Sequence, residues 1–310
     1  MSVTDIEITT FKRVVSCAAL LENLPPTWTL DKRESSRDAL KYRRGEGEII
    51  IVNHNQRGWW DPQSAAKGDV CSLVQYLDRS LTFGQVRKIL RRFVGVSASS
   101  PEYVRTHRPG PSQPPAIRWT ARSPLRVGSP GWNYLAGYRC IPGFVLARAV
   151  GLDAIREGFR GSVWFAHRGD DVVRHVEVRG PTFKGSLRGG SKSLFRLSAS
   201  GVQVITRLAL TEAPIDALSR AAIEGLRPGT LYAATGGGMG IGTIEAIEQV
   251  LIDMAGQGGG ELASATDANV AGERYATRHA ELARSAGINF VRLTPTAGTD
   301  WNDVLKGQGT

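Results

Sequence analysis

Acidic residues follow three apolar segments in the last third of the chain, and their types and spacing are suited to metal-dependent chemistry. Glu212 ends the run "LALTE", Asp267 ends "ASATD", and Asp300 and Asp303 lie in "TAGTDWND". Carboxylates held close together repel one another unless a cation lies among them, and oxygen ligands with few His or Cys favour Mg²⁺ or Mn²⁺ over zinc. The pattern therefore predicts a magnesium site of the kind used in phosphoryl transfer. A competing interpretation, that Asp267 only caps the following helix, stays open.

The elements that must position these acids alternate in type from residue 203 onward. "VITRLALTE" reads as a strand, "PIDALSRAAIEGL" as a helix and "TLYAATG" as the next strand, and the same rhythm continues to "INFVRLTP". Strands and helices that alternate with short loops predict a parallel sheet flanked by helices. Because functional residues of such sheets gather at the carboxyl ends of the strands, we expect the acids to lie at one edge.

Residues 203–306 resemble the toprim domain that is shared by bacterial-type DNA primases, type IA and type II topoisomerases and some nucleases. "TEAPIDALS" matches the first toprim motif, and "ATDANVAGERYA" is similar to the second, D-x-D-x-x-G. "GTDWNDVL" resembles the ending found in toprim proteins of plasmids and other mobile elements. The resemblance implies catalytic roles for Glu212 and Asp267. It also implies a shared set of metal ligands: Glu212, Asp267, Asn269, Asp300 and Asp303.

The second toprim motif departs from the family pattern at one position. Asn269 stands where the family has its second Asp. An amide oxygen can ligate a metal ion, but it brings no negative charge, so the departure predicts weaker Mg²⁺ binding unless Asp300 or Asp303 compensates. A site that has lost its activity is the alternative.

The N-terminal region resembles the zinc-binding domain that precedes toprim in primases, without its metal ligands. "GWWDPQSAAKGDVCSLVQYL" keeps the turn and the helix of that domain. The cysteines Cys17, Cys71 and Cys140 lie far apart, so they fit neither a disulfide framework nor zinc ligand spacing, and no zinc is expected. We predict a smaller α+β domain over residues 1–96, a Pro/Ser/Arg-rich linker over 97–131, a basic α+β connecting region over 132–202 and the toprim domain over 203–310.

The positive charge is concentrated before the predicted toprim domain. The chain carries a net charge of +10, which divides into +5 for residues 1–108, +9 for residues 109–200 and −4 for residues 201–310. A basic region joined to an acidic one favours nucleic-acid binding, whereas an Arg-rich genome would be the plainer explanation. The Gly-rich segment "TFKGSLRGGSKSLFRL" (182–197) and two N-terminal segments with Arg and Trp supply the candidate contacts. The predicted contact residues are Lys184, Arg188, Lys192, Arg196, Arg43, Arg44, Arg57, Trp59 and Trp60.

The resemblance implies a DNA primase-like nucleotidyltransferase from a plasmid, phage or other mobile element, which uses Mg²⁺ or Mn²⁺ to make RNA primers during DNA replication. Its expected partners are DNA, above all single-stranded DNA, nucleotides, and replication or mobilisation proteins. A metal-dependent nuclease or nickase, and a degenerate protein that binds DNA without chemistry, remain as alternatives. No apolar run is long enough for a transmembrane helix and no signal peptide is evident, so we expect a cytoplasmic protein without membrane contact.

Overall fold

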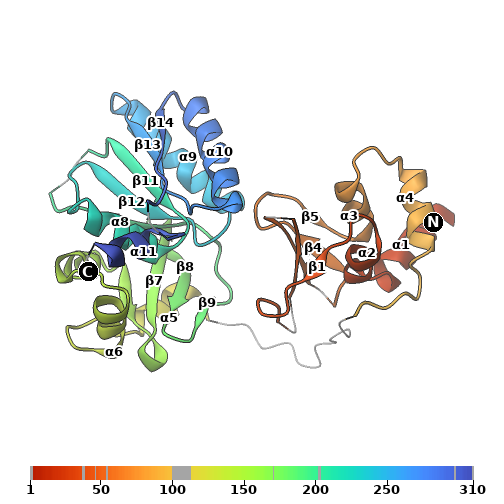
Figure 1. Cartoon of the computed structure of the whole chain (residues 1–310), viewed down its shortest axis with the longest axis horizontal. Coiled ribbons are helices and arrows are strands. Elements are labelled where there is room, and N and C mark those ends of the chain that lie inside the picture. Colours follow the sequence, from red (N-terminus) through yellow and green to blue (C-terminus); the bar gives the residue numbers. More distant parts are fainter. Residues whose placement is uncertain are drawn as a thin grey trace. The chain divides into compact units, whose positions relative to one another are not determined.

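The computed structural model describes residues 3–36, 39–45, 47–53, 55–99, 113–169, 171–201, 204–296 and 298–308. The chain divides into two compact units, Met1–Pro109 and Gly110–Thr310. Each unit has its own sheet, and each sheet is covered by helices (Figure 1).

The first unit combines an antiparallel five-stranded sheet with four helices, which is the α+β domain that the sequence predicts. Its core buries side chains from both kinds of element, among them Leu20, Tyr42, Ile50 and Leu73. Thr82 caps the last helix through a capping box with Gln85. The elements are α1 (Val3–Val14), α2 (Cys17–Asn23), β1 (Thr29–Leu30), β2 (Leu40–Arg44), β3 (Glu48–Asn53), β4 (Gly58–Trp60), β5 (Lys67–Gly68), α3 (Val70–Leu77) and α4 (Phe83–Arg91).

The second unit is built around one nine-stranded sheet. Its first half contains α5 (Pro115–Thr120), α6 (Pro130–Asn133), the π-helix η1 (Tyr134–Tyr138), α7 (Gly143–Gly151), β6 (Ile155–Glu157), the 3₁₀ turn η2 (Phe159–Gly161), β7 (Val163–Gly169), β8 (Val172–Arg179), β9 (Lys184–Ser186) and β10 (Leu194–Ser198). Its second half contains β11 (Arg207–Thr211), α8 (Pro214–Ile223), β12 (Thr230–Ala234), α9 (Ile241–Gly256), β13 (Glu261–Ser264), α10 (Val270–Ser285), β14 (Asn289–Arg292) and α11 (Trp301–Gly307).

The sheet of the second unit is mixed. Strands β14, β13, β11 and β12 lie parallel in that order, as the alternation of elements predicts. Strand β10 then pairs antiparallel with β12 and joins it to the hairpin of β7 and β8. The predicted connecting region thus extends the sheet of the predicted toprim domain.

Helices cover both faces of the parallel strands because alternate residues of each strand point to opposite sides. On β11, Ala209 belongs to the core that includes α8, whereas Leu208 and Leu210 belong to the core of α9 and α10. All three side chains are fully buried. Helix α11 packs beside α8, so one face carries α8 and α11 and the other carries α9 and α10 (Figure 1).

Two predictions about irregular segments need correction. The predicted linker over 97–131 contains α5, which packs against β8 and buries Trp119 in a small core, so residues 113–131 belong to the second unit. Residues 100–112 of that linker lie outside the described residues. The predicted turn region at 58–69 contains β4 and β5, whose two or three residues each are too few to show a strand period in the sequence.

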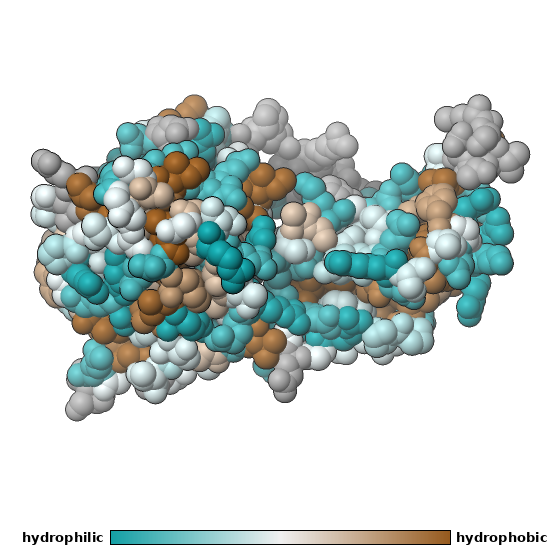
Figure 2. All heavy atoms as spheres, turned by 90° about the horizontal axis from the view of Figure 1, so that it is seen from above, coloured by the Kyte–Doolittle hydropathy of each residue, from teal (hydrophilic) through white to brown (hydrophobic). Residues whose placement is uncertain are grey.

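The surface shows no large unbroken hydrophobic area on the face in Figure 2, where hydrophobic side chains are scattered among hydrophilic ones. Single exposed hydrophobic residues are normal for globular proteins. Within the described ranges, no helix combines the length and the apolar character needed to cross a membrane.

Candidate metal and nucleic-acid site

Glu212 lies directly after β11, where the parallel strands end. The strand stops there because Pro214 begins α8, a position at which its missing N–H costs nothing. The backbone N–H of Gly237 donates to the Glu212 carbonyl at 3.0 Å, which joins this strand end to the neighbouring Gly-rich loop. Gly236 and Gly237 both have positive φ, 69° and 75°, so the loop turns tightly from β12 toward α9 as its glycines predict.

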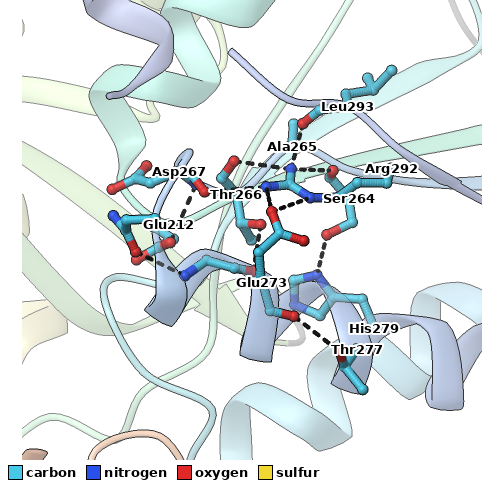
Figure 3. A network of polar contacts seen from close by, with 12 residues as sticks. Glu212, Ser264, Ala265, Thr266, Asp267, Glu273, Thr277, His279, Arg292 and Leu293 are labelled. Carbon is cyan, nitrogen blue, oxygen red and sulfur yellow. Dashed lines mark hydrogen bonds and ion pairs between the residues drawn. The ribbon is translucent and has the colours of Figure 1, made fainter. Parts of the chain in front are cut away.

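Asp267 meets Glu212 from the end of the adjacent strand. The Asp267 backbone N–H donates to Glu212 Oε1 at 3.3 Å, although the two residues are 55 positions apart (Figure 3). Burial and the nearby Asp267 carboxylate raise the pKa of Glu212 to about 7. Burial and the negative charge of Asp300 raise the pKa of Asp267 to about 6. Two half-buried carboxyl groups therefore oppose each other's ionisation.

A third acid of the site, Asp216, lies in the first turn of α8 and was not among the predicted ligands. Its side chain is buried, and its Oδ1 accepts from the backbone N–H of Asn302 at 3.3 Å. Burial raises its pKa well above the ordinary value, and the charges of Asp300, Asp267 and Glu212 add to the shift. Its position four residues after Glu212 on the following helix was the available signal, but sequence alone does not reveal that its side chain is buried.

Two of the remaining predicted ligands, Asn269 and Asp300, cap helices in this structure. Asn269 Oδ1 accepts from the Gly272 backbone N–H at 2.9 Å and caps α10, and the Asn269 residue is exposed. Asp300 caps α11 by accepting from the Asp303 backbone N–H at 2.8 Å. Asp303 is exposed and accepts from Thr299 N at 3.4 Å. Asp300 nevertheless lies close enough to Asp267 and Asp216 to raise the pKa of both.

Arg292 at the end of β14 fixes the loop that carries Asp267. Its guanidinium donates to the carbonyls of Ser264 at 3.1 Å, Thr266 at 3.0 Å and Asp267 at 3.1 Å. The same guanidinium pairs with Glu273 at 2.6 Å (Figure 3). The five N–H donors of a rigid guanidinium allow one Arg side chain to hold several carbonyls at once. The positive charge of Arg292 also lowers the pKa of Asp267, whereas burial and Asp300 raise it.

The four basic residues predicted in segment 182–197 have different environments in the structure. Lys184 on β9 is exposed, and its charge favours the ionised forms of Glu212 and Asp267, which places it on their side of the unit. Arg188 is exposed in the turn that follows β9, and Arg196 is half-buried on β10. Lys192 points inward, where its Nζ donates to the Gly236 carbonyl at 2.9 Å and burial lowers its pKa.

The N-terminal residues that were predicted to contact nucleic acid have partners within their own unit. Arg43 pairs with Asp31 at 2.7 Å, and Arg44 pairs with Glu48. Arg57 donates to two backbone carbonyls of the first unit. Trp59 is 3% exposed and donates from its ring nitrogen to Asp69 O, so its ring leaves no free face for a base and the predicted stacking role is wrong for this residue. Trp60 is half-buried.

The donor set of the site suits a hard divalent cation. Asp267 Oδ1 is buried without a hydrogen-bond partner in the described part of the chain, and the carboxylates around it raise one another's pKa. A divalent cation would satisfy the orphaned oxygen and relieve the repulsion. Among the described residues, no three His, Cys, Asp or Glu side chains are already arranged to hold a metal ion, so the ligands must adjust on binding.

Comparisons with known proteins agree with this arrangement. Residues 209–305 match a family model described as Toprim-like, and residues 133–203 match one described as a protein of unknown function, DUF3991. No curated protein matches the chain.

One similar solved structure contains the zinc-binding and RNA polymerase domains of the Aquifex aeolicus primase. The match has 13% sequence identity and a TM-score of 0.42, and it covers 98% of this chain and 82% of the primase chain. The primase fragment of the bacteriophage T7 primase-helicase is also similar, with 15% sequence identity and a TM-score of 0.39. That match covers 65% of this chain and 79% of the T7 fragment. The matched residues 209–305 include the ends of β11 and β13 with their paired carboxylates. Residues 209–305 therefore form a toprim-like domain, in which Glu212 and Asp267 lie side by side at the ends of neighbouring strands of a mixed sheet.

Proposed function

We propose that this protein is a nucleic-acid enzyme that transfers nucleotidyl groups with Mg²⁺ or Mn²⁺, and that it makes RNA primers on single-stranded DNA as DNA primases do. The observation that carries the proposal is the half-buried pair of Glu212 and Asp267 on a toprim-like domain. The closeness of the two carboxyl groups and the lack of a hydrogen-bond partner for Asp267 Oδ1 do not stabilise the fold, because both make ionisation of these carboxyl groups less favourable.

Glu212, Asp267 and Asp300 would hold the metal ion, with Asp216 behind them. When bound, the cation would neutralise the phosphate oxygens that gain charge in the reaction. Glu212 would accept the proton that an attacking hydroxyl releases as its oxygen bonds to phosphorus and pyrophosphate leaves. In the metal-free chain the pKa of Glu212 is about 7, so this carboxyl can take up and release a proton near neutral pH, as a general base must. Lys184 would contact substrate phosphate beside the pair.

The test is primer synthesis on single-stranded DNA with labelled ribonucleotides, with Mg²⁺ and with a chelator. The wild type should produce short oligonucleotides only with Mg²⁺. Glu212→Gln keeps the shape of the side chain but removes its charge and proton-accepting ability, so it should lower the rate about 100-fold or more. Glu281→Gln is the matched control, because Glu281 is an exposed glutamate on α10 that pairs with Arg278, and it should retain wild-type activity.

Three results would contradict the proposal. Wild-type synthesis by Glu212→Gln would remove Glu212 from the chemistry. Shortened template without primers would identify a nuclease. If the wild type and Glu212→Gln both bind the template but leave it intact and form no product, the protein is a degenerate DNA-binding protein. The helix-capping role of Asn269 favours this alternative.

A further inference from the structure

An exposed tyrosine stands on the π-helix of the second unit. Tyr138 ends η1 and is 61% exposed, whereas Tyr134 one turn earlier is 4% exposed. The two rings stack with their centroids 5.9 Å apart and an interplanar angle of 19°, so the buried ring holds the exposed one in place. π-helices are rare and are frequently found at functional sites, which makes this exposed ring a candidate for a contact.

Two cations lie over the Tyr138 ring, and among the described residues neither has a carboxylate partner. Lys306 Nζ lies 5.0 Å from the ring centroid and Arg139 Cζ lies 5.4 Å from it. In the described residues, Arg139 has neutral side-chain partners: it donates to the Tyr134 hydroxyl at 3.0 Å and to Asn302 Oδ1 at 3.3 Å. Neither cation forms an ion pair there, although residues 201–310 carry a net charge of −4. The surface around Tyr138 is therefore locally positive.

Asn302 connects this surface to the carboxylate site. Its side-chain amide donates to the Arg139 carbonyl at 2.7 Å, while its backbone N–H donates to Asp216 Oδ1 at 3.3 Å. Asn302 is 1% exposed and is also held by Ser219 at 3.0 Å. One buried residue thus fixes Arg139 and the buried acid Asp216 relative to each other.

We propose that Tyr138, Arg139 and Lys306 form a contact site for single-stranded nucleic acid, in which a base stacks on Tyr138 and the two cations bind phosphates. An unpaired base is required, because the paired bases of a duplex offer no free face to a protruding ring. The site rests on the proposed function and adds to it a surface on the side of α11, apart from the basic segment 182–197. It would hold the strand beside the carboxylates through the Arg139–Asn302–Asp216 connection.

The test is the binding of a fluorescein-labelled oligothymidylate to the full chain, measured by fluorescence anisotropy with a chelator present so that no chemistry occurs. Tyr138→Ala should weaken binding about tenfold, which corresponds to about 1.4 kcal/mol and is typical of one stacked base. Tyr138→Phe keeps the ring and should bind like the wild type. Lys306→Ala should reduce the slope of log affinity against log salt by about 0.7, the value for one phosphate contact on a single strand.

Phe159→Ala is the matched control. Phe159 is 64% exposed and lies under the guanidinium of Arg122, which is not part of the proposed site, so its loss should leave binding unchanged. Thermal unfolding of each variant checks that the fold is intact, as expected for changes at exposed rings. If Tyr138→Ala binds as tightly as the wild type, the Tyr138 site is wrong while nucleic-acid binding stands. If the wild type does not bind the oligonucleotide, both the site and the proposed function fail.

Discussion

The fold holds the carboxyl groups of Glu212 and Asp267 close together, although this makes their ionisation less favourable. Their pKa values of about 7 and about 6 reflect burial and mutual repulsion. A folded protein tolerates such a pair only if the rest of the structure supplies the stability, which is common where a site serves binding or catalysis. Because ionised Glu212 is unfavourable in the folded state, its replacement should change the stability of the protein, which can be measured without a substrate.

Glu212→Gln should raise the melting temperature of the metal-free protein at pH 8. Glu212 has an ordinary pKa of 4.5 and a pKa of about 7 in the folded chain, so the folded state keeps a proton that the unfolded state releases. The contribution of Glu212 to the stability of the wild type therefore falls as the pH rises from about 4.5 to about 7 and is constant above that range. Gln has no charge to bury, so thermal unfolding in the presence of a chelator should show its advantage above pH 7.

The pH dependence supplies the control for that prediction. At pH 4 the Glu212 carboxyl is protonated in both states, so the difference between Glu212→Gln and wild type should disappear. A variant that melts below the wild type at pH 8, or an advantage that is the same at both pH values, would show that repulsion in the pair is not what destabilises the fold.

Residue types and order were sufficient to predict Glu212 and Asp267 as paired candidates, because strand ends in a parallel sheet lie together. They were insufficient for Asp216 and Arg292. A carboxyl in the first turn of a helix usually faces solvent, and burial depends on how α11 packs over α8. Asn269 shows the reverse case, since its predicted ligand oxygen accepts a helix-capping bond. Capping and ligation use the same residue types, so sequence cannot separate them.

At the scale of elements, the β13–α10 connection carries Asp267 into the site. Gly272 in the first turn of α10 lies so close to the Asp267 carbonyl that an added Cβ would be 2.0 Å from that oxygen. Thr266 Oγ1 donates to the Gly272 carbonyl at 2.8 Å, and Arg292 holds three carbonyls of the same connection. The position of Asp267 therefore depends on contacts that only a residue without a side chain permits.

Gly272→Ala should destabilise the protein by about 1–3 kcal/mol, as overpacking of a closely packed position does, and should also lower the activity by displacing Asp267. Denaturant unfolding and primer synthesis measure the two effects. Gly256→Ala in α9 is the control, because an added Cβ there meets no atom within 4 Å and should leave both quantities unchanged or raise the stability by up to ~1 kcal/mol. Wild-type stability and activity of Gly272→Ala would refute the close contact.

Long periodic elements were predictable and long-range pairings were not. The alternation of β11, α8 and β12 marked the parallel strands. Nothing local shows that β10 pairs antiparallel with β12, because the paired residues lie 33 or more positions apart in the chain. The sequence therefore predicts a parallel sheet where the structure has a mixed one.

At the scale of the whole molecule, the two units have separate cores. The first unit buries its apolar side chains in one cluster, and the clusters of the second unit lie entirely within residues 110–310. All the carboxylates of the candidate site belong to the second unit. A metal ion bound there should therefore interact with the toprim-like part of the chain and leave the first unit unaffected.

The most direct measurement is a calorimetric titration of the full chain with Mg²⁺ at pH 8, for the wild type and for Asp267→Asn. At pH 8 both carboxyls of the pair are largely ionised, so we predict a saturable site in the wild type. Asp267→Asn should weaken it at least about tenfold, because the change removes a charged ligand. Asp253→Asn, at an exposed aspartate of α9, should bind Mg²⁺ like the wild type. A wild type without a Mg²⁺ site, or equal affinity in Asp267→Asn, would contradict a metal-binding pair at the ends of β11 and β13.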